Sequence, residues 1–166
     1  MKNILYLLLA LASDGISAQT TAEEYLNSAV SKFYLDDMKG AIVDYTKAII
    51  IDPSYVEAYR KRGLAKEELK DFSGAIVDYT KAIEIDPNYA PAYRDRAIAK
   101  GKLKDHSGVV EDFTRAIEID PNYATAYFNR GVSKFYLGDL IGACKDARKA
   151  QELGDDASIL IKKACN

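Results

Sequence analysis

The amino-acid sequence predicts an all-α fold, in which four similar helical units stack into a solenoid and a short C-terminal helix covers the last unit. An Asp-Pro pair recurs at intervals of 34 residues, with its proline at Pro53, Pro87 and Pro121. The ten residues 40–49 also recur unchanged at 74–83. An internal repeat of this length is typical of stacked helical units, because a single unit cannot bury its apolar face alone.

The first element, residues 1–18, has the layout of a secretory signal peptide. Lys2 supplies a positive charge, residues 4–12 are almost entirely apolar, and a short stretch of small and polar residues ends at Ala18. The apolar run is roughly half of the ~20 residues that a membrane-spanning helix needs, which favours cleavage over a retained anchor. A buried N-terminal helix is the other alternative. We expect an exported chain that begins at Gln19 and has no stable membrane insertion.

Four units follow, at about 22–55, 56–89, 90–123 and 124–155, and with the last helix they form one domain over 19–166. Small residues at the eighth, twentieth and twenty-seventh positions let two helices approach, and aromatic residues fill the space between units. The fourth position is always tyrosine: Tyr25, Tyr59, Tyr93 and Tyr127. The twenty-fourth position is aromatic in three units: Tyr45, Tyr79 and Phe113.

These positions resemble the tetratricopeptide repeat family, whose unit is a 34-residue helix-turn-helix. The resemblance covers nearly all of the chain after residue 22. It implies a right-handed superhelical solenoid whose first helices line a concave groove, which receives a peptide or a helix of a protein partner. It also implies a scaffold without enzymatic activity.

Each unit carries its own start and stop signals for two helices. A first helix of about fourteen residues is expected to end at a leucine: Leu35, Leu69, Leu103 or Leu137. An aspartate then follows, placed to accept hydrogen bonds from the free N–H groups of the second helix: Asp37, Asp71, Asp105 or Asp139. Proline ends the second helix in the first three units.

Residues 156–164 are predicted to form a C-terminal capping helix, with Ile159, Leu160 and Ala164 on its apolar side. Cys144 lies ten residues before the turn at Gly154 and Cys165 lies eleven after it. If the flanking helices run antiparallel, the two sulfurs lie at similar heights. We therefore predict a disulfide that fastens the cap, in an oxidising compartment. Two buried free thiols and a redox-active pair are the alternatives.

No catalytic or cofactor-binding motif is present in the sequence. It contains no phosphate-binding glycine loop, no His-Glu-x-x-His and no Gly-x-Ser-x-Gly. The single histidine, His106, excludes a site built from two imidazoles and is expected to pack in a turn. A net charge of −2 gives no basic excess for nucleic acid. We expect no enzyme activity, no cofactor, no metal and no nucleic-acid partner.

A second periodic set consists of charges. Aspartate recurs at the twenty-third position, lysine at the eleventh, and arginine at the seventh position of the last three units: Asp44, Asp78, Asp112, Asp146, Lys32, Lys66, Lys100, Lys134, Arg62, Arg96 and Arg130. We predict ion pairs between the two helices of each unit. We expect these pairs to be exposed and to orient the stack more than they stabilise it, since exposed pairs contribute only about 0–1 kcal/mol each.

The predicted groove face combines an aliphatic stripe, two arginines in the middle units and aromatic pairs in the end units. Such combinations are common at protein interfaces, and arginine can bind a carboxylate with two hydrogen bonds. The alternative is that the stripe packs inside the solenoid and the arginines are merely solvated. The predicted partner-binding residues are Leu26, Val30, Phe33, Tyr34, Arg60, Leu64, Arg94, Ile98, Phe128, Val132, Phe135 and Tyr136.

The family's clamp for chaperone tails is not expected here. That clamp places lysine and asparagine at the fifth and ninth positions of its first unit, where this chain has Leu26 and Val30. It also needs lysine and arginine at the second and sixth positions of the third unit, where Pro91 and Asp95 stand.

The sequence thus favours an exported bacterial scaffold that holds a protein or peptide partner in the periplasm or outside the cell. An architectural protein that self-associates through its ends or convex face is the alternative from another class. An enzyme or a carbohydrate-binding accessory that uses the aromatic pairs is a third.

Overall fold

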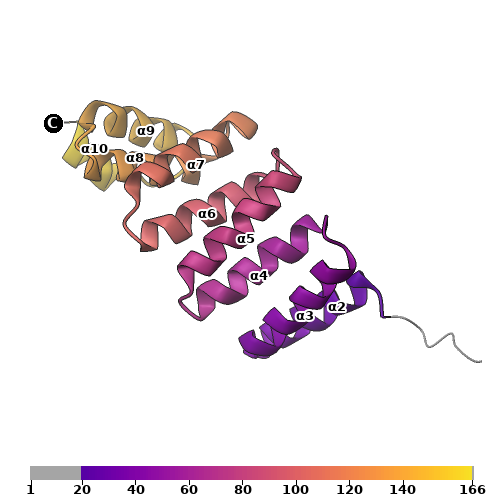
Figure 1. Cartoon of the computed structure of the whole chain (residues 1–166). Helices are drawn as coiled ribbons and strands as arrows, with labels where there is room; N and C mark the ends of the chain where they lie inside the picture. The colour runs from indigo at the N-terminus through magenta and orange to yellow at the C-terminus, as the bar shows by residue number, and fades with distance from the viewer. Residues whose placement is uncertain (1–19, 166) are drawn as a thin grey trace, which may run out of the picture.

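The computed structural model describes residues 20–165, in which every regular element is an α-helix. The predicted signal peptide lies outside the described residues. Four helix pairs follow one another along the solenoid (Figure 1). The first helices are α2 (Ala22–Tyr34), α4 (Val56–Glu68), α6 (Ala90–Lys102) and α8 (Ala124–Tyr136). The second helices are α3 (Met38–Ile51), α5 (Phe72–Ile85), α7 (His106–Ile119) and α9 (Leu140–Glu152).

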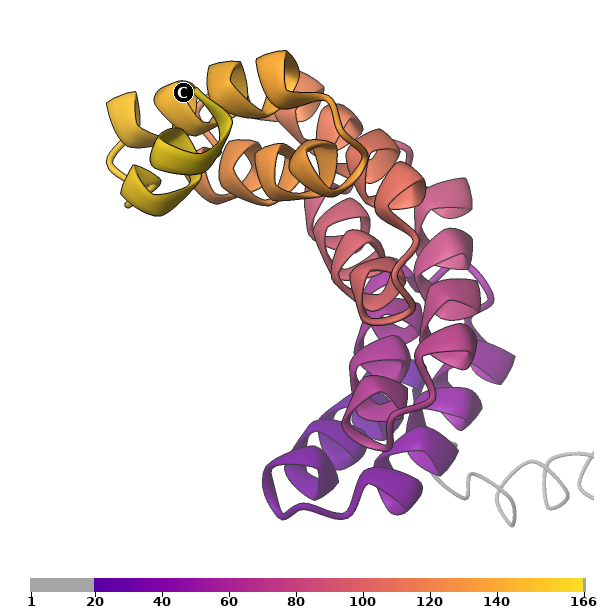
Figure 2. The ribbon, with the colours of Figure 1, turned by 90° about the vertical axis from the view of Figure 1, so that its left-hand side faces the viewer.

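The stack of helix pairs is curved. In Figure 2 the first helix of each pair lies on the inside of the curve and the second helix lies on the outside. This confirms the predicted all-α superhelical solenoid. It also makes the first helices the lining of a concave face.

The expected start and stop signals lie at the ends of the four helix pairs. Each first helix has 13 residues, and the leucine that follows it is its C-terminal cap. Each second helix begins after an aspartate whose side chain accepts a hydrogen bond from the N–H of the glycine three residues on, as Asp71 does from Gly74 at 2.9 Å. This pairing satisfies one of the N–H groups that have no partner within the helix.

Small side chains allow the helices to approach closely. Ala41, Ala75 and Ala143 are fully buried. Gly63 allows a close approach between α4 and α5, because a Cβ atom there would lie 2.5 Å from Cε1 of the buried Tyr79. Glycine at this position therefore makes room for the Tyr79 ring.

The predicted charge ladder is present, but its aspartates are buried rather than exposed. Arg62 binds Asp78 through two hydrogen bonds of 3.0 and 2.6 Å, and Lys66 pairs with the same carboxylate at 2.7 Å. The same geometry recurs at Asp112 and Asp146. The expectation of exposed pairs is wrong because the carboxylates lie between packed helices and are 1–3% exposed.

The ladder also links each unit to the one before it. The Nη1 atom of Arg62 donates to Oγ1 of Thr46 in the preceding unit at 3.1 Å. Arg96 and Arg130 make the same bond to Thr80 and Thr114. The ladder therefore fixes both the pairing within a unit and the stacking between units.

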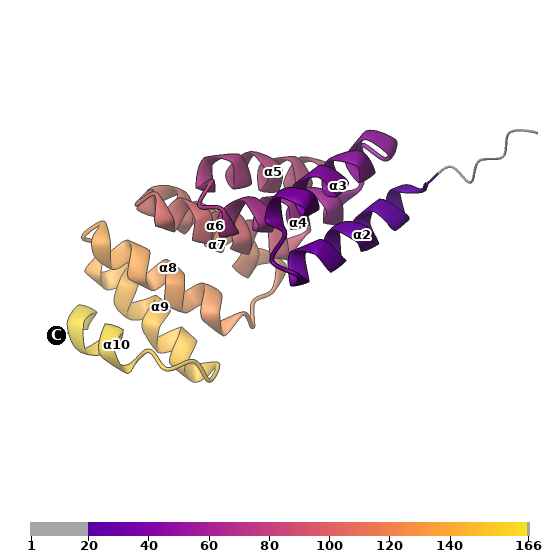
Figure 3. The same ribbon diagram turned by 90° about the horizontal axis from the view of Figure 1, so that it is seen from below.

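The C-terminal helix α10 (Ser158–Ala164) packs on α9 and α8 at the end of the stack (Figure 3). It begins two residues later than predicted, because Asp156 lies outside it and accepts a hydrogen bond from the N–H of Ser158. The Cα atoms of Cys144 and Cys165 lie 5.0 Å apart and their sulfurs 2.11 Å apart. The separation of the Cα atoms is one that a disulfide can bridge.

Candidate interaction groove

The first helices line three depressions along the concave side of the solenoid. The first, of about 220 Å³, is lined by Val30, Phe33, Tyr34, Arg60 and Leu64, together with Lys61 and Tyr45. The middle depression, of about 270 Å³, includes Ile98, Gly101, Lys102, His106 and Val132. The third, of about 230 Å³, includes Phe128, Val132, Phe135 and Tyr136, with Ile159 and Lys163 of α10.

Two of the predicted groove residues line none of these depressions. Leu26 is buried and belongs to the same hydrophobic cluster as Tyr45. Arg94 lies on α6, where its guanidinium group is held by the carboxylate of Asp95. The other predicted groove residues all line at least one depression.

The aromatic pairs at the two ends have the same geometry. Phe33 and Tyr34 pack edge to face with ring centroids 6.1 Å apart, and Phe135 and Tyr136 do the same at 6.1 Å. Tyr34 is 83% exposed and Tyr136 is 67% exposed. These rings remain available for contact with a second molecule.

His106 is partly buried at the start of α7, after the turn of its unit. Its ring stacks on Tyr136 of the next unit, with centroids 4.8 Å apart and the planes 15° from parallel. The two rings form part of the wall between the middle and third depressions.

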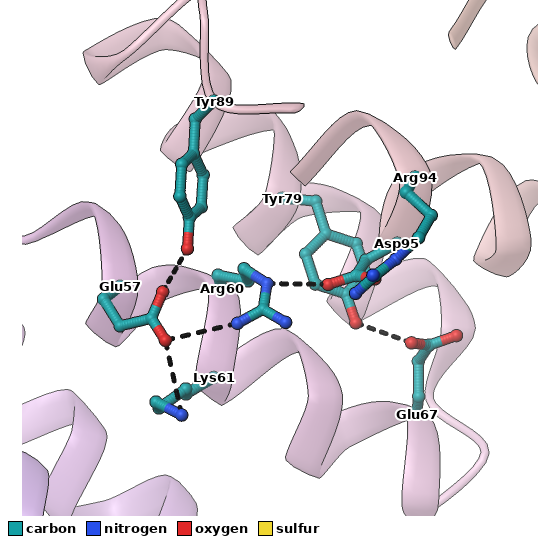
Figure 4. Close-up of polar contacts among 8 residues, drawn as sticks. All are labelled: Glu57, Arg60, Lys61, Glu67, Tyr79, Tyr89, Arg94 and Asp95. Atoms are coloured by element: carbon teal, nitrogen blue, oxygen red, sulfur yellow. Dashed lines mark hydrogen bonds and ion pairs between the residues drawn. The ribbon is translucent and has the colours of Figure 1, made fainter. Parts of the chain in front are cut away.

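A polar network connects the second and third units and is organised around Asp95 (Figure 4). Arg60, on α4, donates from Nε to Oδ2 of Asp95 at 2.8 Å. Arg94 donates to Oδ1 of the same carboxylate at 2.8 Å. Asp95 is almost completely buried, so both arginines are engaged within the chain and are not merely solvated.

Glu57 forms one end of this network. It accepts hydrogen bonds from Arg60 and from the hydroxyl of Tyr89, and it pairs with Lys61 at 3.3 Å. Burial raises the pKa of Glu57, but Tyr89, Arg60 and Lys61 together outweigh burial and lower it. Burial and the neighbouring Glu57 raise the pKa of Tyr89 to about 12. At this end of the network, the negative charge of Glu57 is therefore balanced by Arg60 and Lys61 of the same chain.

Glu67, near the other end of α4, has a different environment (Figure 4). It accepts a hydrogen bond from the hydroxyl of Tyr79 at 2.6 Å. Among the described residues, no lysine or arginine lies within 4.0 Å of its carboxylate. Burial, together with the charges of Asp95 and Glu68, raises the pKa of Glu67, although the Tyr79 hydrogen bond and the positive charge of Lys102 lower it.

Sequence reasoning did not assign Tyr79, Tyr89 and Asp95 to the groove. Helical spacing places Glu57 and Glu67 on the groove face, but they were not among the predicted partner-binding residues. One signal was available at the sixth position of the units, which reads Asn27, Lys61, Asp95 and Asn129. Residues that stack the units have the same type in successive units, whereas the residue type at the sixth position varies from unit to unit. A buried charge at a non-repeating position was therefore a candidate for specificity.

The fold and this groove define a helical-repeat solenoid protein. Residues 56–89 match the tetratricopeptide repeat family. The helix pair of this match recurs in the three other units, and the chain is a tetratricopeptide-repeat protein. No curated protein sequence matches the chain.

Several solved structures share this fold. A structure of MamA protein is 25% identical, with a TM-score of 0.81 and coverage of 86% of this chain and 80% of MamA. The first TPR of Spaghetti (RPAP3), bound to HSP90 peptide SRMEEVD, is 26% identical, with a TM-score of 0.69. The match covers 75% of this chain and 99% of the Spaghetti chain. MamA 41-end from Desulfovibrio magneticus RS-1 is 17% identical, with a TM-score of 0.77. The match covers 87% of this chain and 89% of the MamA chain.

Two other features of residues 20–165 concern membranes and metals. None of their helices combines the length and apolar character needed to cross a bilayer. Their histidine, cysteine, aspartate and glutamate side chains form no group of three that could hold a metal ion.

Proposed function

We propose that this chain is an exported bacterial scaffold without enzymatic activity, which holds a protein or peptide partner in its concave groove. The observation that carries the proposal is the series of three depressions, lined by aliphatic and aromatic side chains of the first helices. A groove formed before binding loses little conformational entropy when a partner enters. The peptide held by the similar fold of Spaghetti (RPAP3) supports a peptide-binding role.

The test is site-specific crosslinking in the bacterium that produces the chain. A photoreactive phenylalanine analogue replaces Tyr34 or Tyr136 in the groove, and in the matched controls it replaces Ile50 or Ile141. Both controls are strongly exposed, at 73% and 87%, on the outer helices. We expect one partner protein to be captured from both groove positions and from neither outer position. Capture from the outer positions alone would contradict a groove-binding scaffold.

An architectural role through self-association is the second candidate. Exposed aliphatic residues on the outer helices favour it, namely Ile50, Val77 and Ile141. Sedimentation of the purified protein at several concentrations tests this role. A mass that rises with concentration, and falls to that of the monomer in Ile50→Ser/Ile141→Ser, would support self-association. A monomer at all concentrations would contradict it.

Two features support export to the periplasm or the cell exterior. One is the signal-peptide layout of residues 1–18. The other is the pairing geometry of Cys144 and Cys165, since disulfides persist in oxidising compartments. We expect the protein recovered from the cell envelope to begin at Gln19 by mass spectrometry. Two reactive thiols in the denatured, unreduced protein would contradict the disulfide.

A further inference from the structure

The groove does not have the same chemistry along its length. At the twelfth position of the four units, on the concave side, stand Phe33, Glu67, Gly101 and Phe135. At this position the two end units carry aromatic side chains, and the second unit carries the carboxylate of Glu67. A partner that spans the groove would therefore meet aromatic side chains at both ends and this carboxylate on the way.

The arginines of the groove do not offer an anion-binding site. Both guanidinium groups bind Asp95, and Arg60 is also shared with Glu57. A carboxylate from a partner would have to displace the internal carboxylate of Asp95, which is buried between them. The two arginines are thus poorly suited to bind an acidic segment such as the peptide SRMEEVD, which the similar fold of Spaghetti (RPAP3) binds.

Glu67 has the opposite property, because its charge is not balanced by an ion pair. Tyr79 is fully buried and its hydroxyl holds one oxygen of Glu67, while Gly63 makes room for the tyrosine ring. Lys102, exposed at the end of α6, makes no ion pair with Glu67. The half-buried carboxylate is held in place and can accept hydrogen bonds from a cation on another molecule.

We propose that the groove selects a segment in which lysine or arginine lies between aromatic or aliphatic side chains. The cation pairs with Glu67, and the apolar side chains enter the depressions beside Leu64 and Ile98. The preference for a basic segment has two causes. Glu67 attracts the cation, and Asp95 neutralises the two arginines that would otherwise attract an acidic segment. This inference rests on the proposed peptide-binding function and specifies the chemistry of its partner.

The test is selection from a displayed library of random dodecapeptides on the purified protein. We expect enriched peptides to carry a lysine or arginine flanked by aromatic or aliphatic residues. Binding of an enriched peptide should weaken about tenfold in Glu67→Gln, because a partly buried ion pair is lost. Glutamine can still accept the Tyr79 hydrogen bond. Glu84→Gln, which removes the same charge from the outer helix α5, should change binding less than twofold.

A second variant tests the other half of the proposal. Asp95→Asn leaves Arg60 and Arg94 without their shared carboxylate, so it should enrich acidic peptides from the same library. Circular dichroism establishes that each variant is folded, and Glu67→Gln decides the proposal if Asp95→Asn does not fold. Enrichment of acidic or neutral peptides by the unmodified protein, or a basic preference that persists in Glu67→Gln, would overturn it. If no peptide is enriched at all, the proposed peptide-binding function fails as well.

Discussion

Asp78 on α5 and Asp95 on α6 are both buried, and both bind arginine, yet only one of them recurs in every unit. Asp78 has counterparts in Asp44, Asp112 and Asp146, and each binds basic side chains of its own unit. Asp95 has no counterpart, and it joins Arg60 of the second unit to Arg94 of the third. A buried aspartate bound to arginine therefore occurs both as a repeated contact within units and as a single contact between two units.

The difference indicates separate roles for the two kinds of aspartate. A contact that stacks units must recur wherever two units meet, as the bonds from Arg62, Arg96 and Arg130 to the preceding threonine do. A contact that occurs once, on the concave face, adjusts the groove at one place. We therefore expect the repeated aspartates to determine stability and Asp95 to determine which partners bind.

The largest expected effect comes from removing an aspartate of the ladder. Asp78→Ala leaves Arg62 and Lys66 partly buried without a counterion, and it should lower the free energy of unfolding by about 3–5 kcal/mol. Asp95→Ala should cost less, because Arg60 keeps Glu57 and the Arg94 side chain is 38% exposed to water. Urea denaturation followed by circular dichroism measures both. Equal losses of unfolding free energy in the two variants would show that the repeated and the single aspartate contribute alike to stability.

The first unit gives a smaller, pH-dependent test of the ladder. Its seventh position is Ser28 instead of arginine, and Asp44 accepts hydrogen bonds from Ser28, Lys32 and Lys47. Burial raises the pKa of Asp44, but these three donors outweigh burial and lower it from 3.8 to about 2. Asp44 therefore stabilises the fold above the pKa of the unfolded chain, and this stabilisation is lost as the pH falls toward 2.

The measurement is the free energy of unfolding of the unmodified protein and of Asp44→Asn between pH 5 and pH 2. At pH 5 the unmodified protein should be more stable by an amount on the order of 2 kcal/mol, and the gap should narrow as Asp44 is protonated. A gap that stays constant over this range would show that the Asp44 charge does not contribute.

The sequence alone predicts the repeated part of this molecule well. The capping aspartates and the ladder follow from spacings within one unit, and each is confirmed at several positions. The burial of the aspartates was not predicted, because it depends on how closely the helices pack around them. The arginines of the ladder are also in contact with tyrosine rings. Arg62, for example, lies over the ring of Tyr59 at 5.6 Å from the centroid.

The singular part of the groove was harder to predict. The partnership of Arg60 with Asp95 joins residues 35 apart on different units, and the stacking of His106 on Tyr136 also crosses from one unit to the next. These contacts depend on the rotation between neighbouring units, which no local pattern specifies. The aromatic pairs were found from the sequence because they break the repeat at positions already known to face the groove.

The smallest expected effect concerns the bond between units. Thr80→Val keeps the shape of the side chain and removes the acceptor for Nη1 of Arg96, which lies 3.0 Å away. Arg96 keeps both bonds to Asp112, so the loss should be about 1 kcal/mol. Thr125→Val is the matched control, because Thr125 is exposed and should change stability by less than about 0.5 kcal/mol. If Thr80→Val costs no more than this control, the arginine-to-threonine bonds do not hold the units together, and the stacking depends on other contacts.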